Sequence, residues 1–226
     1  MPSNSYPIIA KEGWLFIGVL IVLLTVAYYY LGNTATGIAA TLLVITLFLL
    51  RDPGQKIASS PLAIVSPVFG KIISVDDDVE DPWVSRRAKQ IRIKIRLLDI
   101  YSIRSPIEGK IVNQWTRRPD GENNGRRFAF RVRSDEGDEI VVVTSLNFLT
   151  AFFFKFYVHS GERLGHGQRC GYLYFGGMVD VLVPKNSSIR VESGTRVNSG
   201  SDVIAQLVHT GCESVIKPRE EPVSQS

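Results

Sequence analysis

Apolar residues are concentrated in two runs near the start of the chain. The first, Trp14 to Leu31, is 18 residues long, and Thr25 is its one strongly polar residue; after a short polar segment, Ala35 to Leu50 follows. At about 1.5 Å per residue these runs give helices of roughly 27 and 24 Å, close to the ~30 Å hydrocarbon core of a bilayer. The pattern predicts a transmembrane helical hairpin over residues 14–50, behind a cytoplasmic stub of residues 1–13. One tilted span is the alternative, and a cleaved signal peptide is disfavoured because the apolar run is too long.

The charges that flank the hairpin predict its orientation. Lys11 precedes it, Arg51 and Lys56 follow it, and the turn between the two apolar runs carries no charge. Because positive flanks stay on the cytoplasmic side, both ends of the hairpin are expected there. The prediction is therefore an inner (cytoplasmic) membrane protein whose soluble domain faces the cytoplasm. A single span would instead put that domain outside.

Beyond residue 51 the pattern changes to short alternating segments. Gln90 to Arg96 alternates strictly between polar residues and isoleucine, which is typical of a strand with one buried face. Glu139 to Thr144 and Val179 to Val183 are further expected strands, and Gly and Pro separate such segments at short intervals. These features predict a mainly β domain over residues 51–212. The polar, proline-containing residues 213–226 are expected to be a disordered tail.

Two motifs occur twice within this β domain. SPVFGKI at Ser66–Ile72 resembles SPIEGKI at Ser105–Ile111, and VHSGERL at Val158–Leu164 resembles VESGTRV at Val191–Val197. Each copy of the second motif continues to a glycine and then to an apolar strand. Paired hairpins of this kind predict two halves related by a pseudo-two-fold axis, as in a barrel-sandwich hybrid. Coincidental turn chemistry is the alternative for either repeat taken alone.

Charge and composition narrow the class of protein. The 226 residues include 26 Lys and Arg, 22 Asp and Glu, three His and two Cys, which excludes a disulfide scaffold. No metal site is expected, because the spacing of His159, His166 and Cys170 matches no familiar set of ligands. Six cations fall within 11 residues and could contact anionic lipid headgroups, although a solvated strand face explains them as well; they are Arg86, Arg87, Lys89, Arg92, Lys94 and Arg96. Nucleic acid is not an expected partner.

The phenylalanine-rich segment Phe148–Val158 has one charged residue, Lys155. A buried pair of strands is one explanation for it. A lip that dips into the membrane interface beside the hairpin is the other.

Five motifs, taken in order, resemble the phosphatidylserine decarboxylase family in its short, membrane-anchored form. The family reads Arg-Asp-Pro, Ser-Pro-Ala-Asp-Gly, Asp-Val-His followed by Arg and Pro, Asn-Glu-Arg, and Phe-Gly-Ser-Arg-Val-Asp. The corresponding segments here are Arg51–Pro53, Ser66–Gly70, Asp99–Pro106, Glu122–Asn123 and Phe175–Pro184. The resemblance extends from about Lys11 to Leu207. It implies a decarboxylase-like β domain behind a membrane anchor.

The resemblance implies the activity of that family, whose enzymes convert phosphatidylserine to phosphatidylethanolamine with a pyruvoyl group made from their own chain. A serine hydroxyl attacks the preceding glycine carbonyl, and elimination leaves the pyruvoyl group, which forms a Schiff base with the substrate amine and accepts electrons as carbon dioxide leaves. An Asp and a His assist cleavage and place protons. This chain differs at all three positions: Gly177 replaces the serine, Tyr101 the histidine and Phe69 the aspartate.

These replacements predict a family member without self-cleavage, pyruvoyl cofactor or catalytic residues. Such a protein would bind membrane aminophospholipid such as phosphatidylserine, form a homo-oligomer, or pair with an active decarboxylase. Two alternatives stay open. One is an active decarboxylase with unconventional maturation, for which Gly200-Ser201 is the remaining Gly-Ser pair, although a turn explains it more simply. The other is a structural barrel of the membrane-adaptor type.

Overall fold

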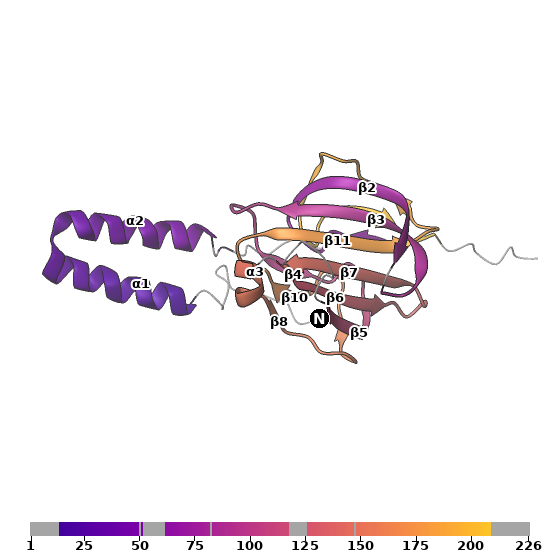
Figure 1. Ribbon diagram of the computed structural model, residues 1–226, viewed down its shortest axis with the longest axis horizontal. Helices are drawn as coiled ribbons and strands as arrows, with labels where there is room; N and C mark the ends of the chain where they lie inside the picture. The colour runs from indigo at the N-terminus through magenta and orange to yellow at the C-terminus, as the bar shows by residue number, and fades with distance from the viewer. Residues whose placement is uncertain are drawn as a thin grey trace, which may run out of the picture.

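The computed structural model describes residues 14–49, 51, 62–81, 83–117, 126–146 and 148–208. The first apolar run is a continuous helical segment made of α1 (Trp14–Val26) and the π-helical turn η2 (Ala27–Leu31). It is long and apolar enough to span a membrane. After Gly32 the chain turns back into α2 (Asn33–Leu49), and the two helices form a hairpin that projects from one end of a β domain (Figure 1). The predicted stub and the predicted tail lie outside the described residues.

Four threonine hydroxyls of the hairpin are bonded within their own helical segments. The hydroxyls of Thr25, Thr36, Thr41 and Thr46 each donate to the backbone carbonyl four residues earlier, at 2.8–3.0 Å. Such bonds remove the need for water around a hydroxyl, which is the requirement for a helix in hydrocarbon. The second helix begins two residues earlier than the sequence predicted, because Gly32 alone, with a φ of +84°, makes the turn.

The domain behind the hairpin is mainly β, as predicted, and its large sheet curls into half of a barrel (Figure 1). That antiparallel sheet has eight strands in the order β13 (Arg196–Val197), β2 (Gly70–Asp81), β3 (Arg86–Ile95), β11 (Gly177–Pro184), β7 (Glu139–Leu146), β6 (Arg126–Arg133), β5 (Gly109–Arg117) and β9 (Arg163–Leu164). Two three-stranded sheets accompany it. One contains β1 (Ala63–Val65), β14 (Val203–Gln206) and β12 (Ser188–Ile189), and the other β4 (Ser102–Arg104), β10 (Arg169–Tyr172) and β8 (Lys155–Phe156).

The three strands expected from the sequence are present within β3, β7 and β11. In β7, the side chains of Ile140, Val142 and Leu146 join the main core, whereas Val141 and Val143 belong to a smaller cluster on the other face. Because both faces of this strand are buried, its sequence is a continuous apolar run rather than an alternation.

The repeated motifs confirm the predicted pseudo-two-fold relation. Ser66 Oγ donates to the carbonyl two residues further on at 2.7 Å, and Ser105 Oγ does the same at 2.7 Å. The carbonyl of Ser66 accepts from the Gly200 N–H at 2.8 Å, and that of Ser105 accepts from the Gly167 N–H at 3.1 Å. Each copy of the first motif therefore bonds to the segment that follows the opposite copy of the second.

The glycines of the first motif show the same correspondence. Gly70 pairs with Val197 of β13, and Gly109 pairs with Leu164 of β9. A Cβ atom on either glycine would collide with a carbonyl oxygen of the neighbouring strand. Both halves therefore need glycine at this position because the backbones approach closely, not because of a special dihedral angle.

Candidate functional site

The three positions singled out by the family resemblance lie around one end of β3. Gly177 is the first residue of β11 and pairs with Ile95, the last residue of β3. Phe69 immediately precedes β2, whose residue Lys71 pairs with Lys94. Tyr101 follows β3 by one short loop. The fold thus brings together three positions, of which Phe69 and Gly177 are more than 100 residues apart in the sequence.

The turn that leads into Gly177 has an unusual backbone. Phe175, Gly176 and Gly177 have φ angles of +63°, +77° and +155°. A Cβ on Gly176 would lie 2.6 Å from the carbonyl oxygen of Ile95, so only glycine fits there. At Gly177 a Cβ would lie 3.1 Å from Leu173 Cδ2. Residue 177 also has a φ that residues with a side chain rarely adopt. The backbone therefore makes the turn at Phe175–Gly177, but residue 177 carries no hydroxyl.

Tyr101 is buried, with 2% of its surface exposed, and its hydroxyl donates a hydrogen bond to the backbone carbonyl of Leu97. Burial and the nearby Asp99 charge raise the pKa of the Tyr101 phenol to about 12. An imidazole at this position would exchange a proton near neutral pH, whereas this phenol keeps its proton. The Tyr101 hydroxyl therefore ties together the two ends of the loop that follows β3.

Phe69 is buried as well, with 8% exposed. A benzyl side chain neither accepts a proton nor carries a charge, so no group at this position can assist an acyl transfer. Together, Phe69 and Tyr101 make the surroundings of Gly177 more apolar than the carboxylate and imidazole of the family motif would.

The remaining Gly-Ser pair lies in an ordinary turn. Gly200 has a φ of +76°, and the Ser201 N–H bonds to the carbonyl of Asn198 at 3.4 Å between β13 and β14. Its counterpart in the other half is the turn at Gly167. The turn explanation given by the sequence is therefore confirmed.

The six cations predicted to contact lipid headgroups differ in whether a carboxylate lies beside them. Four of them face carboxylates on other strands of the large sheet: Arg86 lies 3.6 Å from Glu139, Arg87 2.6 Å from Asp78, Lys89 3.6 Å from Asp77 and Arg92 2.8 Å from Asp180. Among the residues that the structure describes, Lys94 and Arg96 have no carboxylate partner. Lys94 and Arg96 lie on either side of Ile95, the last residue of β3, which pairs with Gly177.

The hairpin meets the domain beside the same turn. The ring of Phe16 in α1 lies 6.2 Å from that of Phe153 in α3 (Phe148–Phe153) and 6.3 Å from that of Tyr174. The rings of Phe153 and Phe175 are 5.7 Å apart.

The phenylalanine-rich segment is a short helix followed by β8, rather than the buried pair of strands that the sequence favoured.

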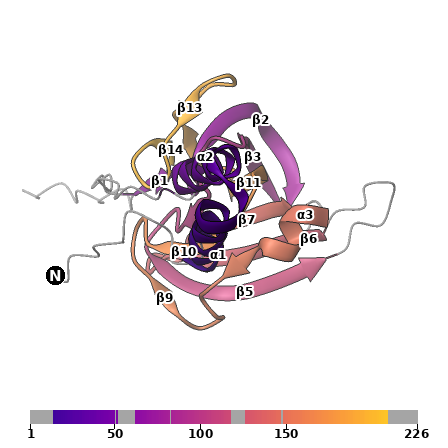
Figure 2. The same ribbon diagram turned by 90° about the vertical axis from the view of Figure 1, so that its left-hand side faces the viewer.

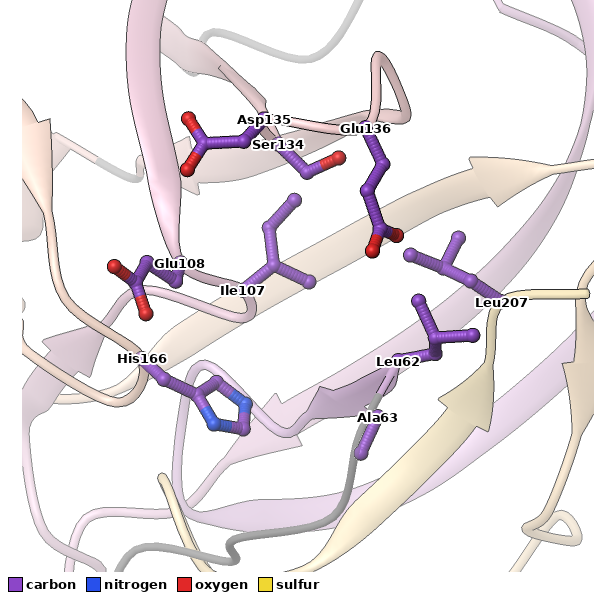
Figure 3. Close-up of a pocket in the computed structure, with 9 residues that line it drawn as sticks. All are labelled: Leu62, Ala63, Ile107, Glu108, Ser134, Asp135, Glu136, His166 and Leu207. Atoms are coloured by element: carbon purple, nitrogen blue, oxygen red, sulfur yellow. The ribbon is translucent and has the colours of Figure 1, made fainter. Parts of the chain in front are cut away.

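A pocket of about 290 Å³ lies at the opposite end of the sheet, near the turn between β6 and β7. Its lining combines acidic, apolar and imidazole side chains, as Figure 3 shows: Leu62, Ala63, Ile107, Glu108, Ser134, Asp135, Glu136, His166 and Leu207. Burial lowers the pKa of His166 despite the nearby Glu108 charge and backbone hydrogen bonds that raise it, so the imidazole is neutral at pH 7. The sequence did not predict this pocket, because its lining comes from five separated segments.

This pocket is the pseudo-two-fold counterpart of the Gly177 site. The Leu207 N–H donates to the Leu62 carbonyl at 2.9 Å, just as the Leu173 N–H donates to the Tyr101 carbonyl at 2.8 Å. Glu108 precedes Gly109 in the same way that Phe69 precedes Gly70. Leu62 therefore stands where the other half has Tyr101. The two ends of one symmetric scaffold carry different chemistry, and the pocket is about 20 Å along the sheet from Gly177.

Comparison with known proteins assigns most of the chain to one group. A family model described as phosphatidylserine decarboxylase matches residues 43–205. The phosphatidylserine decarboxylase proenzyme of Nitrosomonas eutropha is 34% identical over 217 residues, which cover 91% of this chain and 99% of that protein. The proenzymes of Nitrosomonas europaea and Aromatoleum aromaticum are each 31% identical, over 98% and 99% of their lengths.

Proposed function

The chain belongs to the phosphatidylserine decarboxylase family, and on that basis we propose that it is a non-catalytic, membrane-anchored member that binds aminophospholipid or pairs with an active decarboxylase. Family membership places it in phospholipid metabolism. The apolar segment Trp14–Leu31 indicates membrane anchoring.

One observation carries the non-catalytic part of the proposal: the position that supplies the pyruvoyl group in the family is Gly177. An ester with the preceding carbonyl requires a hydroxyl, and elimination to a ketone requires a β-carbon that bears the leaving oxygen. Glycine has neither. Residue 177 therefore does not fit a pyruvoyl group, and catalysis cannot proceed through such a group at this position.

The two neighbouring replacements support the same conclusion. Tyr101, whose pKa is raised to about 12, retains its proton, and Phe69 has no proton to exchange. Apolar walls with a few polar groups are typical of sites that hold small amphiphilic molecules. The replaced positions thus favour holding a lipid over transferring protons.

Lys94 and Arg96 are the side chains that we propose contact the headgroups. Each cation near an anionic surface contributes roughly 1 kcal/mol of attraction. Both flank Ile95, which pairs with Gly177, so a headgroup held there would lie beside the family's reaction position. The positive residues that flank the hairpin in the sequence, Lys11, Arg51 and Lys56, support an inner-membrane location with this end of the domain at the cytoplasmic leaflet.

A second candidate function is an active decarboxylase. It is favoured by relatives that are named as proenzymes and match 91% of the chain, and by the turn before Gly177, whose three successive positive φ angles are built for close backbone approach. It requires a source of the pyruvoyl group other than residue 177.

The test uses the full chain reconstituted in nanodiscs that contain phosphatidylserine and phosphatidylcholine. We expect no phosphatidylethanolamine after prolonged incubation, and we expect phosphatidylserine to be enriched over phosphatidylcholine among the lipids that remain bound in native mass spectrometry. Replacing both Lys94 and Arg96 with glutamine should abolish this enrichment. The matched control is Arg87→Gln, because Arg87 is paired with Asp78 at the far end of the sheet.

Formation of phosphatidylethanolamine would establish the second candidate instead. Equal retention of both lipids by the unaltered chain would contradict headgroup binding. The structural-barrel alternative would then be the better description.

A further inference from the structure

Several large apolar side chains are exposed at the hairpin end of the β domain. They come from the loop after β3, from α3 and from the turn that leads into β11 together with the start of that strand, and we call them the apolar rim: Leu97 (55% exposed), Leu98 (64%), Phe152 (82%), Phe175 (49%) and Met178 (38%). Leucine and phenylalanine side chains this exposed are unremarkable one at a time, but a group of them on one end of a domain marks a contact surface.

The rim is continuous because these three parts of the chain pack against one another. Met178 pairs with Lys94 across β11 and β3, which brings the turn at Phe175 beside the start of the Leu97–Leu98 loop. Phe153 connects the other side, with ring-centre distances of 5.9 Å to Phe152 and 5.7 Å to Phe175.

The rim also adjoins the hairpin. Phe153 packs on Phe16 in the first turn of α1, so the rim begins where the membrane segment leaves the domain. Figure 1 shows α3 at the end of the domain from which the hairpin projects, and Figure 2, which looks at that end, shows α3 on the near side beside the hairpin.

The ends of the hairpin place this part of the domain at the level of the lipid headgroups. An 18-residue segment is about 27 Å long and crosses the hydrocarbon core once, so its first residue, Trp14, stays at the interface. Arg51, just after α2, lies 3.8 Å above the ring of Phe48, an arrangement suited to the same depth. The domain is joined to both helices at this level.

We propose that the apolar rim inserts into the membrane interface and forms a second attachment of the domain to the bilayer. The occupant of this surface is the lipid bilayer itself, because the rim is continuous with a segment that enters it. Lys94 and Arg96 border the rim and match an anionic headgroup layer. The hairpin tethers the chain, whereas the rim fixes the domain with the turn at Phe175–Gly177 facing lipid. This inference does not depend on whether the site at Gly177 is catalytic.

The test measures depth in the bilayer with spin labels on the full chain in nanodiscs. Labels at Leu98→Cys and Phe152→Cys, in a Cys212→Ser background, report accessibility to lipid-soluble oxygen and to a water-soluble nickel chelate. Cys170 needs no replacement because its thiol is fully buried and burial raises its pKa. The control label is Val208→Cys, whose parent side chain is 46% exposed beside the pocket at the opposite end.

We expect both rim labels to be more accessible to oxygen than to the chelate, and the label at 208 to show the reverse. Rim labels that match the control would overturn the proposal. Rim labels sheltered from both reagents would overturn it as well, because they would show that a second protein copy or partner covers the rim. Both rim side chains are largely exposed, so neither label should disturb folding.

Discussion

Gly177→Ser puts back the residue type that the family resemblance places at this position. We predict that the variant is less stable than the natural chain and still does not cleave itself. Both parts of the prediction follow from the surroundings of residue 177.

The loss of stability can be worked out from the backbone. Gly177 has a φ of +155°, and an added Cβ would lie 3.1 Å from Leu173 Cδ2 and 3.3 Å from the carbonyl oxygen of Ser145. The leucine methyl can move aside, but the carbonyl belongs to β7 and cannot. A side chain in such a conformation costs about 1–3 kcal/mol. For a domain of this size, that corresponds to a decrease of roughly 2–12 °C in Tm.

The absence of cleavage follows from Tyr101 and Phe69, which leave no group to accept the proton of a new serine hydroxyl. The assay is a thermal melt of the detergent-solubilised chain together with intact mass spectrometry. Gly177→Ala is the matched control, since it adds the Cβ without the hydroxyl and should lose similar stability. A serine variant as stable as the natural chain would refute the strain argument. A serine variant that splits into two chains would refute the claim that residues 69 and 101 block maturation.

Two further predictions concern the scaffold. Ser66→Ala and Ser105→Ala should each reduce the free energy of unfolding by about 0.5–1.5 kcal/mol in chemical denaturation, because each removes one equivalent buried hydrogen bond; clearly unequal losses would contradict the pseudo-two-fold relation. Burial raises the pKa of Glu139, but the hydrogen bond from Arg133 and the neighbouring arginine charges outweigh burial and leave that pKa below its usual value. The contribution of Glu139 to the free energy of unfolding is therefore present above about pH 4.3 and lost as the pH falls through its lower folded-state pKa. Glu139→Gln should flatten the acid side of a curve of stability against pH. An unchanged curve would exclude this carboxylate as a source of acid sensitivity.

The local patterns in the sequence were sufficient for much of the fold. The apolar run from Trp14 predicted the first helix, and strict alternation from Gln90 predicted the middle of β3. The repeated Ser-Pro and Ser-Gly motifs predicted the pseudo-two-fold relation, because identical turn chemistry produces identical backbone hydrogen bonds in both halves.

Long-range pairing limited the prediction of the sites. The basic run Arg86–Arg96 contains no acidic residue that would suggest an ion pair, yet Arg92 donates a hydrogen bond to Asp180, which is 88 positions away. The acidic run Asp76–Asp78 was the available signal, since a hairpin would bring it opposite Arg87 and Lys89. The helix α3 was missed because its six residues are too few to show a helical period.

The most direct test of the central claim is the intact mass of the purified full chain. We predict a single species of 25.1 kDa, because Gly177 cannot form the ester that precedes chain cleavage. Two fragments, the smaller one blocked at its N-terminus, would contradict the account and identify, through the fragment mass, the residue that provides a pyruvoyl group.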